Sequence, residues 1–203
     1  MSVNGRLDTT EKVMTHLSVG HQQQQDAYRV LHESGLLFML SAHAAFPAGT
    51  VPIDVHLPDS DLDILCYSED LNAFQVKMAR QLESIAVNGR TEWTFGDHAS
   101  GQNVYVTCKL TLGLWPVEIF AQATLVDQQN AYLHMQVEWS LLQLWGEAGQ
   151  REIRRLKRAG WKTEPAFAHV LGLEGDPYIA MRDLASLQKP ELWDFARSRV
   201  TFK

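Results

Sequence analysis

The sequence is poor in cysteine and has no long apolar segment. Only two of its 203 residues are cysteines, Cys66 and Cys108, and they share no CxxC spacing. We therefore expect no disulfide framework, and both thiols are predicted to be buried in a reducing compartment. The longest nearly apolar run, LLFMLSAHAAF, is too short to cross a bilayer, and the N-terminus has no apolar core of signal-peptide length. These absences predict a cytoplasmic globular protein without membrane contact.

Positive charge is also scarce. Lys and Arg number 18 against 24 Asp and Glu, so the net charge is −6. A negative chain repels the nucleic-acid backbone, so we expect no unspecific binding to DNA, although a local basic patch is compatible with this charge. The sequence also contains no Gly-x-Ser-x-Gly, no HExxH and no P-loop. The usual signatures of serine hydrolases, zinc peptidases and P-loop NTPases are thus missing.

Apolar periodicity predicts helices at both ends of the chain and strands between them. Helical spacing is found over 22–35 and from Leu71 to Ile85, and it returns from about residue 127, with later short helices marked by Pro165, Pro177 and Pro190. Strand-like runs occupy 61–67, 91–95, 103–112 and 115–120. We therefore predict an α+β fold. A small mixed β-sheet flanked by helices, residues 1–126, is followed by a C-terminal helical lobe packed on it, residues 127–203.

The segment DSDLDI, residues 59–64, places two acidic residues one position apart in a predicted strand. Residues i and i+2 of a strand face the same side, so Asp61 and Asp63 project together, roughly 7 Å apart, while Leu62 and Ile64 enter the core. Two neighbouring negative charges repel unless a cation lies between them, which makes a hard divalent ion such as Mg²⁺ or Mn²⁺ the natural partner. A solvated strand end remains the alternative for such a short pattern.

Two further features extend this pattern to a possible site. In Val117-Glu118-Ile119, strand periodicity turns Glu118 away from its apolar neighbours, onto a face that the aspartates can share. Gly49-Thr50 lies twelve residues before Asp61; glycine allows close backbone approach to a ligand, and a threonine can offer its hydroxyl to a phosphate. Together these residues predict three carboxylates that hold a metal ion beside bound phosphates.

At this point the sequence resembles the polymerase-beta-like nucleotidyltransferase superfamily, whose motif runs from a Gly-Ser step through Asp-x-Asp to a third carboxylate. The wider chain, over roughly residues 20–185, is similar to a bacterial domain-of-unknown-function family of nucleotidyltransferase-like proteins. The similar segments are AGTVPID, SDLDI, VEIFAQ, QNAYLHMQVE and KTEPAFAHVLGLEGDPY. The resemblance implies a short mixed sheet flanked by helices, with Asp61, Asp63 and Glu118 as catalytic metal ligands and Gly49 and Thr50 as phosphate contacts.

The chain departs from the superfamily pattern in its positive charge. Thr50 is followed by Val51-Pro52-Ile53-Asp54, so a bound triphosphate has no cationic neighbour there. The missing charge can come from Lys109, on the polar face of its strand, or from an arginine stripe with helical spacing. That stripe comprises Arg151, Arg154, Arg155 and Arg158. A stripe of this kind is also typical of a solvated helix face.

His134 and Glu138, at i and i+4 of a predicted helix, are accessory candidates. They can position a base or a ligand, and the alternative is a surface pair. Our leading hypothesis is a metal-dependent enzyme that moves a nucleotidyl group from a nucleoside triphosphate to a hydroxyl of a small molecule, protein or RNA. The alternative is an inactive nucleotidyltransferase-like module that binds a partner, as an antitoxin does, through the helical lobe.

Overall fold

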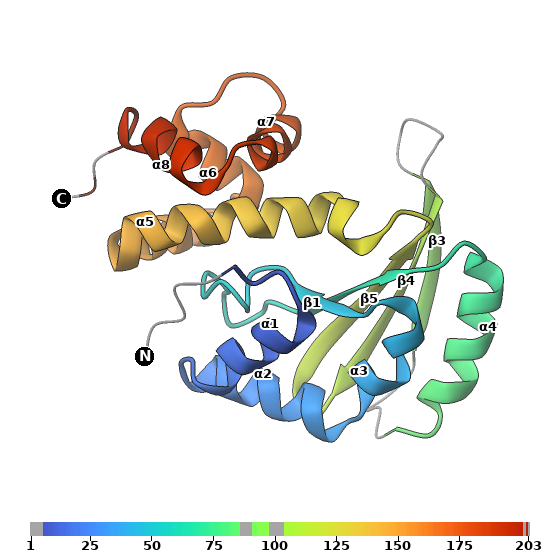
Figure 1. Ribbon diagram of the computed structural model, residues 1–203. Helices are drawn as coiled ribbons and strands as arrows, with labels where there is room; N and C mark the ends of the chain where they lie inside the picture. Colours follow the sequence, from blue (N-terminus) through green and yellow to red (C-terminus); the bar gives the residue numbers. More distant parts are fainter. Residues whose placement is uncertain (1–5, 86–90, 98–103, 201, 203) are drawn as a thin grey trace.

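The protein is built around a five-stranded mixed β-sheet, as the computed structural model in Figure 1 shows. The structure describes residues 6–85, 91–97, 104–200 and 202. The strand order is β1-β2-β5-β4-β3, where β2 and β5 are parallel and the other neighbours are antiparallel. The strands are β1 (Phe46–Ala48), β2 (Leu62–Tyr67), β3 (Glu92–Asp97), β4 (Val104–Leu112) and β5 (Trp115–Gln122).

Eight α-helices are formed by the described residues. Four precede or interrupt the strands: α1 (Thr10–Ser18), α2 (Gln22–Glu33), α3 (Leu36–Met39) and α4 (Leu71–Leu82). Four follow them: α5 (Asn130–Arg158), α6 (Thr163–Leu171), α7 (Pro177–Asp183) and α8 (Lys189–Arg197). No helix in these described ranges is both long enough and apolar enough to cross a membrane.

Local sequence signals explain where several helices begin and end. The Asp70 side chain accepts a hydrogen bond from the Ala73 N–H at 2.9 Å and so caps α4, whose Phe74, Met78 and Leu82 are buried. Asp176 caps α7 in the same way, and Pro177 supplies the fixed φ of a first helical residue. Gly172 ends α6 in a left-handed conformation.

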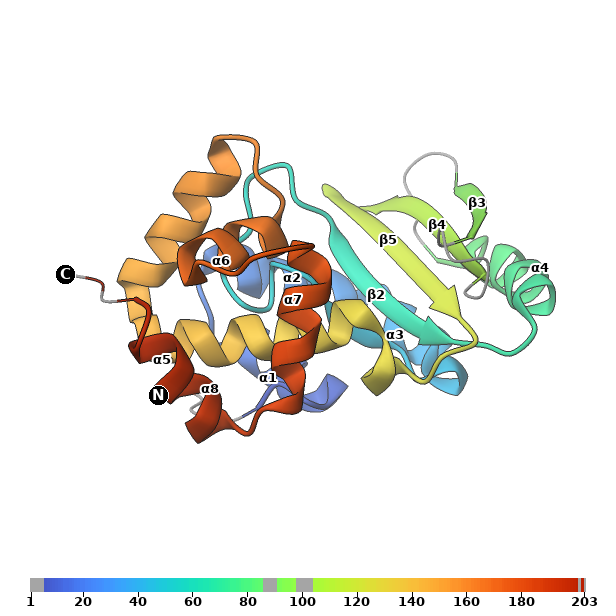
Figure 2. The same cartoon turned by 90° about the horizontal axis from the view of Figure 1, so that it is seen from above.

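The long helix α5 is bent at Gly146, whose φ of 61° and ψ of −154° are not helical. Figure 2 shows the change of direction clearly: the second part of the helix turns away from the first and leads into α6. Helices α6, α7 and α8 then pack back onto α5. The bend therefore lets one helix follow the sheet with its first part and carry the C-terminal lobe with its second.

The predicted α+β fold is confirmed, including the small mixed sheet and the helices that follow it. Cys66 and Cys108 are free and buried, as predicted. The sequence periodicity did not single out α1 or the short strand β1. Strand β1 has only three residues and one of them is a proline, so it offers too little alternation to be recognised.

Candidate active-site cleft

A cleft of about 700 Å³ lies between one face of the sheet and the helical lobe. Its sheet wall is formed by side chains from alternate positions of β2 and β5, together with the loop that follows β1. Its helical wall comes from α5, α6 and α7. The lining includes Gly49, Thr50, Asp63, Leu65, Glu118, Phe120, Gln129, His134, Glu138, Glu164, Tyr178 and Arg182.

Charged residues form one row across the sheet wall. Asp63 on β2 is paired in register with Glu118 on β5, and Glu118 is paired with Lys109 on β4. Adjacent strands are roughly 4.8 Å apart and paired residues face the same side, so the three side chains project together. The Lys109 Nζ lies 3.5 Å from the Glu118 Oε2. The structure thus brings Asp63, Glu118 and Lys109 onto one face, although Glu118 is already engaged by Lys109.

Gly49 sits directly under the Asp63 carboxylate. Ala48, the last residue of β1, is paired with Asp63, and the chain then turns at Gly49 with a φ of 75°. A Cβ at this position would lie 1.9 Å from the Asp63 Oδ2, so only glycine leaves room for the carboxylate. The close approach anticipated for Gly49 is therefore made to Asp63 itself, and Thr50 follows at the edge of the cleft.

The loop after Thr50 is buried rather than open to a ligand. Val51, Ile53 and Val55 are fully buried, and the Gln24 side chain donates hydrogen bonds to the Val51 and Pro52 carbonyl oxygens at 3.0 and 3.1 Å. These contacts anchor the loop to α2. The residues after Thr50 are thus part of the hydrophobic core, where an unpaired basic side chain would be costly to bury.

The environment of Asp63 is unfavourable to its charge. Burial, with added repulsion from Asp61 and Glu118, raises the pKa of Asp63 to about 8. Asp61, just before β2, is therefore within electrostatic reach of Asp63, but it does not line the cleft. Among the described residues no group of three His, Cys, Asp or Glu side chains stands close enough to hold a metal ion. The three carboxylates are thus not assembled into a metal site in this structure, and Glu118 is paired with Lys109. Asp63, with Asp61 and Glu118 near enough to repel it, is nevertheless part of a donor set that suits a hard divalent cation.

The helical wall contains His134 and Glu138 of α5. Both are buried, so the alternative of a surface pair is wrong for them. The His134 ring nitrogens lie 3.3 Å from the Glu164 Oε1 of α6 and 2.9 Å from the Tyr178 carbonyl oxygen of α7. His134 therefore joins three helices of the lobe. Burial alone would raise the pKa of Glu164, but the hydrogen bond from His134, with the charges of His134 and Lys157, holds it below its usual value.

Glu138 is the most enclosed acidic group of this wall. Burial, reinforced by the negative charge of Glu164 and only partly opposed by Lys157, raises the pKa of Glu138 well above its usual value. Its Oε1 is buried and has no hydrogen-bond partner among the described residues. A carboxyl group held in this way is stabilised by any donor or cation that reaches it.

Lys157, on the second part of α5, is the cation most closely coupled to these acids. Burial lowers its pKa, while the charges of Glu138, Glu164 and Asp63 act in the opposite direction. The sequence pattern singled out the arginines around Lys157 but neither Lys157 itself nor Glu164. Spacing could not distinguish Lys157, which lies only three residues after Arg154, and the fold alone brings it within electrostatic reach of the acids.

The structure places Arg154 and Arg158 away from the cleft, beside another cavity of about 450 Å³. The Arg154 Nη2 lies 2.6 Å from the Oδ1 of the buried Asp54, and it also donates to the Asp54 carbonyl oxygen. Arg158 is exposed. Arg151 and Arg155 form ion pairs within α5, with Glu147 and Glu152. The stripe thus stabilises the fold or faces solvent, and it is not brought to the carboxylates.

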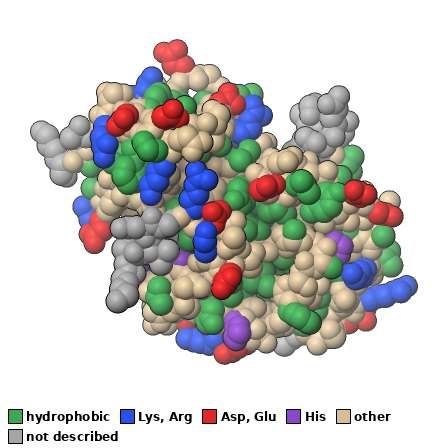
Figure 3. Space-filling view, in the orientation of Figure 1, with side chains coloured by type: hydrophobic (Ala, Val, Ile, Leu, Met, Phe, Trp, Pro, Cys, Tyr) green, Lys and Arg blue, Asp and Glu red, His purple; other side chains and the backbone are tan. Residues whose placement is uncertain are grey.

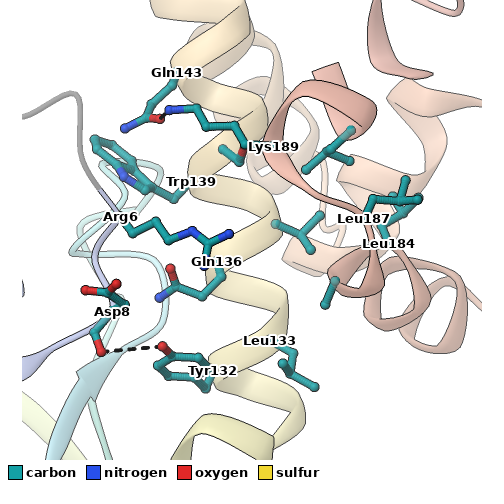
Figure 4. A pocket seen from close by; sticks show the side chains of 14 residues that line it. Arg6, Asp8, Tyr132, Leu133, Gln136, Trp139, Gln143, Leu184, Leu187 and Lys189 are labelled. Carbon is teal, nitrogen blue, oxygen red and sulfur yellow. Dashed lines mark hydrogen bonds between the residues drawn. The ribbon is translucent and has the colours of Figure 1, made fainter. Parts of the chain in front are cut away.

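A smaller cavity of about 170 Å³ lies elsewhere along α5, next to the N-terminal segment and α8 (Figure 4). Leucines close one side, and Arg6, Trp139 and Gln136 form the other. Tyr132 donates to the Asp8 carbonyl oxygen there at 3.4 Å. None of the residues singled out from the sequence lines this cavity, so the cleft at Asp63 is the better candidate for function.

Comparison with solved structures shows where this fold is found. The chain is similar to the Cid1 structure described for its RNA terminal uridylyl transferase activity, with 13% identity, a TM-score of 0.52 and coverage of 80% of this chain and 52% of that one. It is also similar to the structure of the GLD-2/RNP-8 complex, with 10% identity, a TM-score of 0.51 and coverage of 80% of this chain and 62% of that one. A third similar structure is the Cid1 poly(U) polymerase described with Mg 3′-dATP bound, with 12% identity, a TM-score of 0.51 and coverage of 85% of this chain and 52% of that one. The chain thus spans roughly half to three-fifths of the length of these structures.

At such low identity the similarity shows the fold, which is that of the polymerase-beta-like nucleotidyltransferases, as the sequence resemblance had predicted. No curated protein sequence matches the chain. A family model described as "Domain of unknown function (DUF4269)" matches residues 29–184, which cover the sheet, the cleft and most of the lobe. The protein is therefore a member of the DUF4269 family, built on the nucleotidyltransferase fold.

Proposed function

We propose that the protein transfers a nucleotidyl group from a nucleoside triphosphate to a hydroxyl acceptor in the cleft at Asp63. The observation that carries this proposal is the placement of Asp63. Its carboxylate is held over Gly49, in register with Glu118, and its pKa is raised to about 8 by burial and by Asp61 and Glu118. A structural carboxylate is normally paired with a cation or with backbone donors, whereas this one is kept among like charges at the wall of a cleft.

In the proposed reaction the acceptor oxygen attacks the α-phosphorus of the triphosphate. A new O–P bond forms, the bond from the α-phosphorus to the bridging oxygen breaks, and pyrophosphate leaves with that electron pair. The hydroxyl proton passes to a carboxylate of the cleft wall. A bound Mg²⁺ or Mn²⁺ would neutralise the developing negative charge, and Asp61, Asp63 and Glu118 are the residues that would hold it.

The triphosphate needs positive charge that the buried loop after Thr50 does not provide. Gly49 and Thr50 can offer backbone N–H groups and a hydroxyl, and Lys109 lies at the same wall. On the opposite side, Arg182 lines the cleft and Lys157 is coupled to Asp63. We therefore propose that the two parts of the chain, 1–126 and 127–203, act together, with cations from both parts compensating the triphosphate.

The Cid1 structures named above are described with RNA terminal uridylyl transferase activity and with Mg 3′-dATP bound. These descriptions support a nucleoside triphosphate and Mg²⁺ as ligands of this chain. An inactive binding module remains a second candidate, because Glu118 is engaged by Lys109 and no group of three acidic or imidazole ligands is assembled among the described residues.

The decisive experiment is a transfer assay with each of the four α-labelled nucleoside triphosphates and Mg²⁺ or Mn²⁺. Label would be sought in small molecules, RNA and protein. We expect Asp63→Asn to lower the rate by roughly 10³-fold, which corresponds to about 4 kcal/mol of lost transition-state stabilisation. Asp59→Asn, the same change at an exposed neighbour, should leave the rate within about twofold, since surface substitutions have small effects. Transfer that survives Asp63→Asn would exclude this mechanism, and no transfer with any triphosphate would favour the binding module.

A further inference from the structure

One carboxyl group that lines the cleft has an oxygen with no hydrogen-bond partner among the described residues. Glu138 is 3% exposed, it lines the cleft, and its Oε1 has no hydrogen-bond partner among the described residues. Leaving a buried polar atom unpaired costs roughly 1 to 3 kcal/mol. A ligand that donates a hydrogen bond to Glu138 would remove this penalty.

A second buried acceptor lines the same cleft. Gln129, 1% exposed, donates from its Nε2 to the Cys66 and Thr124 carbonyl oxygens, both at 2.9 Å. Its donors are thus used, and its Oε1 is left without a partner in the described part of the chain. Both unsatisfied groups can accept, so the cleft is prepared for a ligand rich in N–H or O–H donors.

The charges around Glu138 favour a cationic donor. Glu164 interacts with it electrostatically from α6, and His134 lies beside Glu164. Lys157 attracts Glu138 electrostatically, yet it forms no ion pair with a carboxylate among the described residues. An ammonium group brings donors, no acceptor and a full positive charge, and it therefore satisfies Glu138 better than a neutral hydroxyl does.

The same charges disfavour RNA as the acceptor. Single-stranded RNA is held by basic grooves with aromatic stacking surfaces. Here Asp63, Glu118, Glu138 and Glu164 line the cleft, against Arg182 as the one Lys or Arg among its lining residues. On the face in Figure 3 basic side chains gather mainly over the helical lobe and are interspersed with acidic ones, so the described part of this face carries no continuous basic band.

We propose that the acceptor is a small hydroxyl compound that carries a protonated amine, such as an amino sugar or amino alcohol. Its ammonium group binds at Glu138, supported by Glu164, and its hydroxyl faces Asp63. The assignment of the hydroxyl rests on the proposed nucleotidyl transfer, whereas the amine site stands on Glu138, Gln129 and the charge of the cleft.

The test measures amine binding in EDTA without nucleotide, so that it does not depend on catalysis. A panel of amino sugars and amino alcohols, each paired with its N-acetylated form, would be titrated by calorimetry or ligand-observed NMR. At least one free amine should bind ten-fold or more tightly than its acetylated partner, because acetylation removes the charge and most donors. Glu138→Gln should abolish this preference, and Glu174→Gln, the loss of an exposed carboxylate from the same lobe, should preserve it.

Each result bears on the proposal. Should Glu138→Gln fail to fold, Glu164→Gln provides the second variant, and a severalfold loss of amine preference is expected from it. Equal binding of amines and acetylated partners, or a preference unaffected by both variants, would overturn the amine site. A Glu138→Gln effect confined to the choice between ATP and UTP would also overturn the amine site, because the group that donates to Glu138 would then be a nucleobase. Label found on RNA would overturn the proposal of a small-molecule acceptor.

The failure of the transfer hypothesis has a different signature. If Asp63→Asn and wild type both lack transfer but retain amine binding that depends on Glu138, the nucleotidyl transfer is excluded and the amine site remains. If label reaches neutral acceptors in a reaction that depends on Asp63, and free amines bind no more tightly than their acetylated partners, transfer is supported and the amine site is overturned.

Discussion

Asp63 and Arg154 both belong to regular charge patterns in the sequence, but the fold gives them opposite surroundings. Arg154, on the second part of α5, lies 2.6 Å from the buried Asp54 and also binds its carbonyl oxygen. Asp63, on β2, is surrounded by Asp61 and Glu118, and its pKa is raised to about 8. The charge of Arg154 is compensated by an opposite charge, whereas Asp63 is repelled by its neighbours on the sheet.

This difference separates a structural charge from a functional one. A compensated pair stabilises the fold as long as both partners remain, because removing one leaves the other buried and alone. An uncompensated charge lowers stability until a ligand of opposite sign arrives, so its presence indicates a site. Substitutions in the two regions should therefore change stability in opposite directions.

The largest expected effect comes from the compensated region. Arg154→Ala should lower the free energy of unfolding by about 3 kcal/mol, since Asp54 is left buried and, among the described residues, His21 and His56 are the basic groups that remain paired with its carboxylate. Chemical denaturation measures the change. The exposed Arg158→Ala is the matched control and should lose less than about 0.5 kcal/mol. Equal losses in the two variants would show that the pair of Arg154 with Asp54 stabilises the fold no more than an exposed arginine does.

Gly49→Ala tests how tightly the Asp63 carboxylate is seated. The new Cβ would lie 1.9 Å from the Asp63 Oδ2 at a φ of 75°, so we expect a loss of about 2 kcal/mol together with displacement of the carboxylate. Gly175→Ala is the control: its φ is 84°, no atom lies within 4 Å of the added Cβ, and backbone strain alone should cost about 1 kcal/mol. Only Gly49→Ala should abolish thermal stabilisation by Mn²⁺. A full Mn²⁺ response in Gly49→Ala would argue against a metal at Asp63.

Asp63→Asn should change the free energy of unfolding in the opposite direction. In EDTA we expect a gain of at least about 1 kcal/mol at pH 8, because the uncharged amide escapes burial of a charge and repulsion by Asp61 and Glu118. A folded pKa raised to about 8 means that wild type loses stability as pH rises from the unfolded pKa near 4 and stops losing it above pH 8. The advantage of Asp63→Asn should therefore grow over that range and then level off. Melting curves at several pH values measure it, and a loss of stability at pH 8 would identify Asp63 as a structural residue.

Lys109→Gln should have the smallest effect on stability. Its ion pair with Glu118 is largely exposed, so the free energy of unfolding should change by less than about 0.5 kcal/mol. Release of Glu118 should, however, raise the affinity for Mn²⁺ severalfold, as seen by calorimetry without nucleotide. Lys77→Gln, on the exposed side of α4, is the control for a general change in net charge. Equal Mn²⁺ affinity in both variants would show that Lys109 does not compete for Glu118.

The sheet wall was predictable because strand geometry is local. Asp63 and Glu118 were placed on one face by two-residue alternation, and the parallel pairing of β2 with β5 then made them neighbours. The helical wall was predictable only in part. His134 and Glu138 were recognised as a pair at i and i+4, but their burial and their partner Glu164 depend on how α6 packs against α5.

The sequence by itself determined most of the helices and strands and the shared face of Asp63 and Glu118, because hydrophobic periodicity and strand alternation act over a few residues. Only the tertiary structure decided which charges are compensated. Arg154 meets an aspartate 100 positions away, Asp63 is repelled by Asp61 and Glu118, and the buried Oε1 of Glu138 has no hydrogen-bond partner among the described residues. The free energy of a buried charge depends on groups brought together by folding, and their separation along the chain carries no record of that proximity.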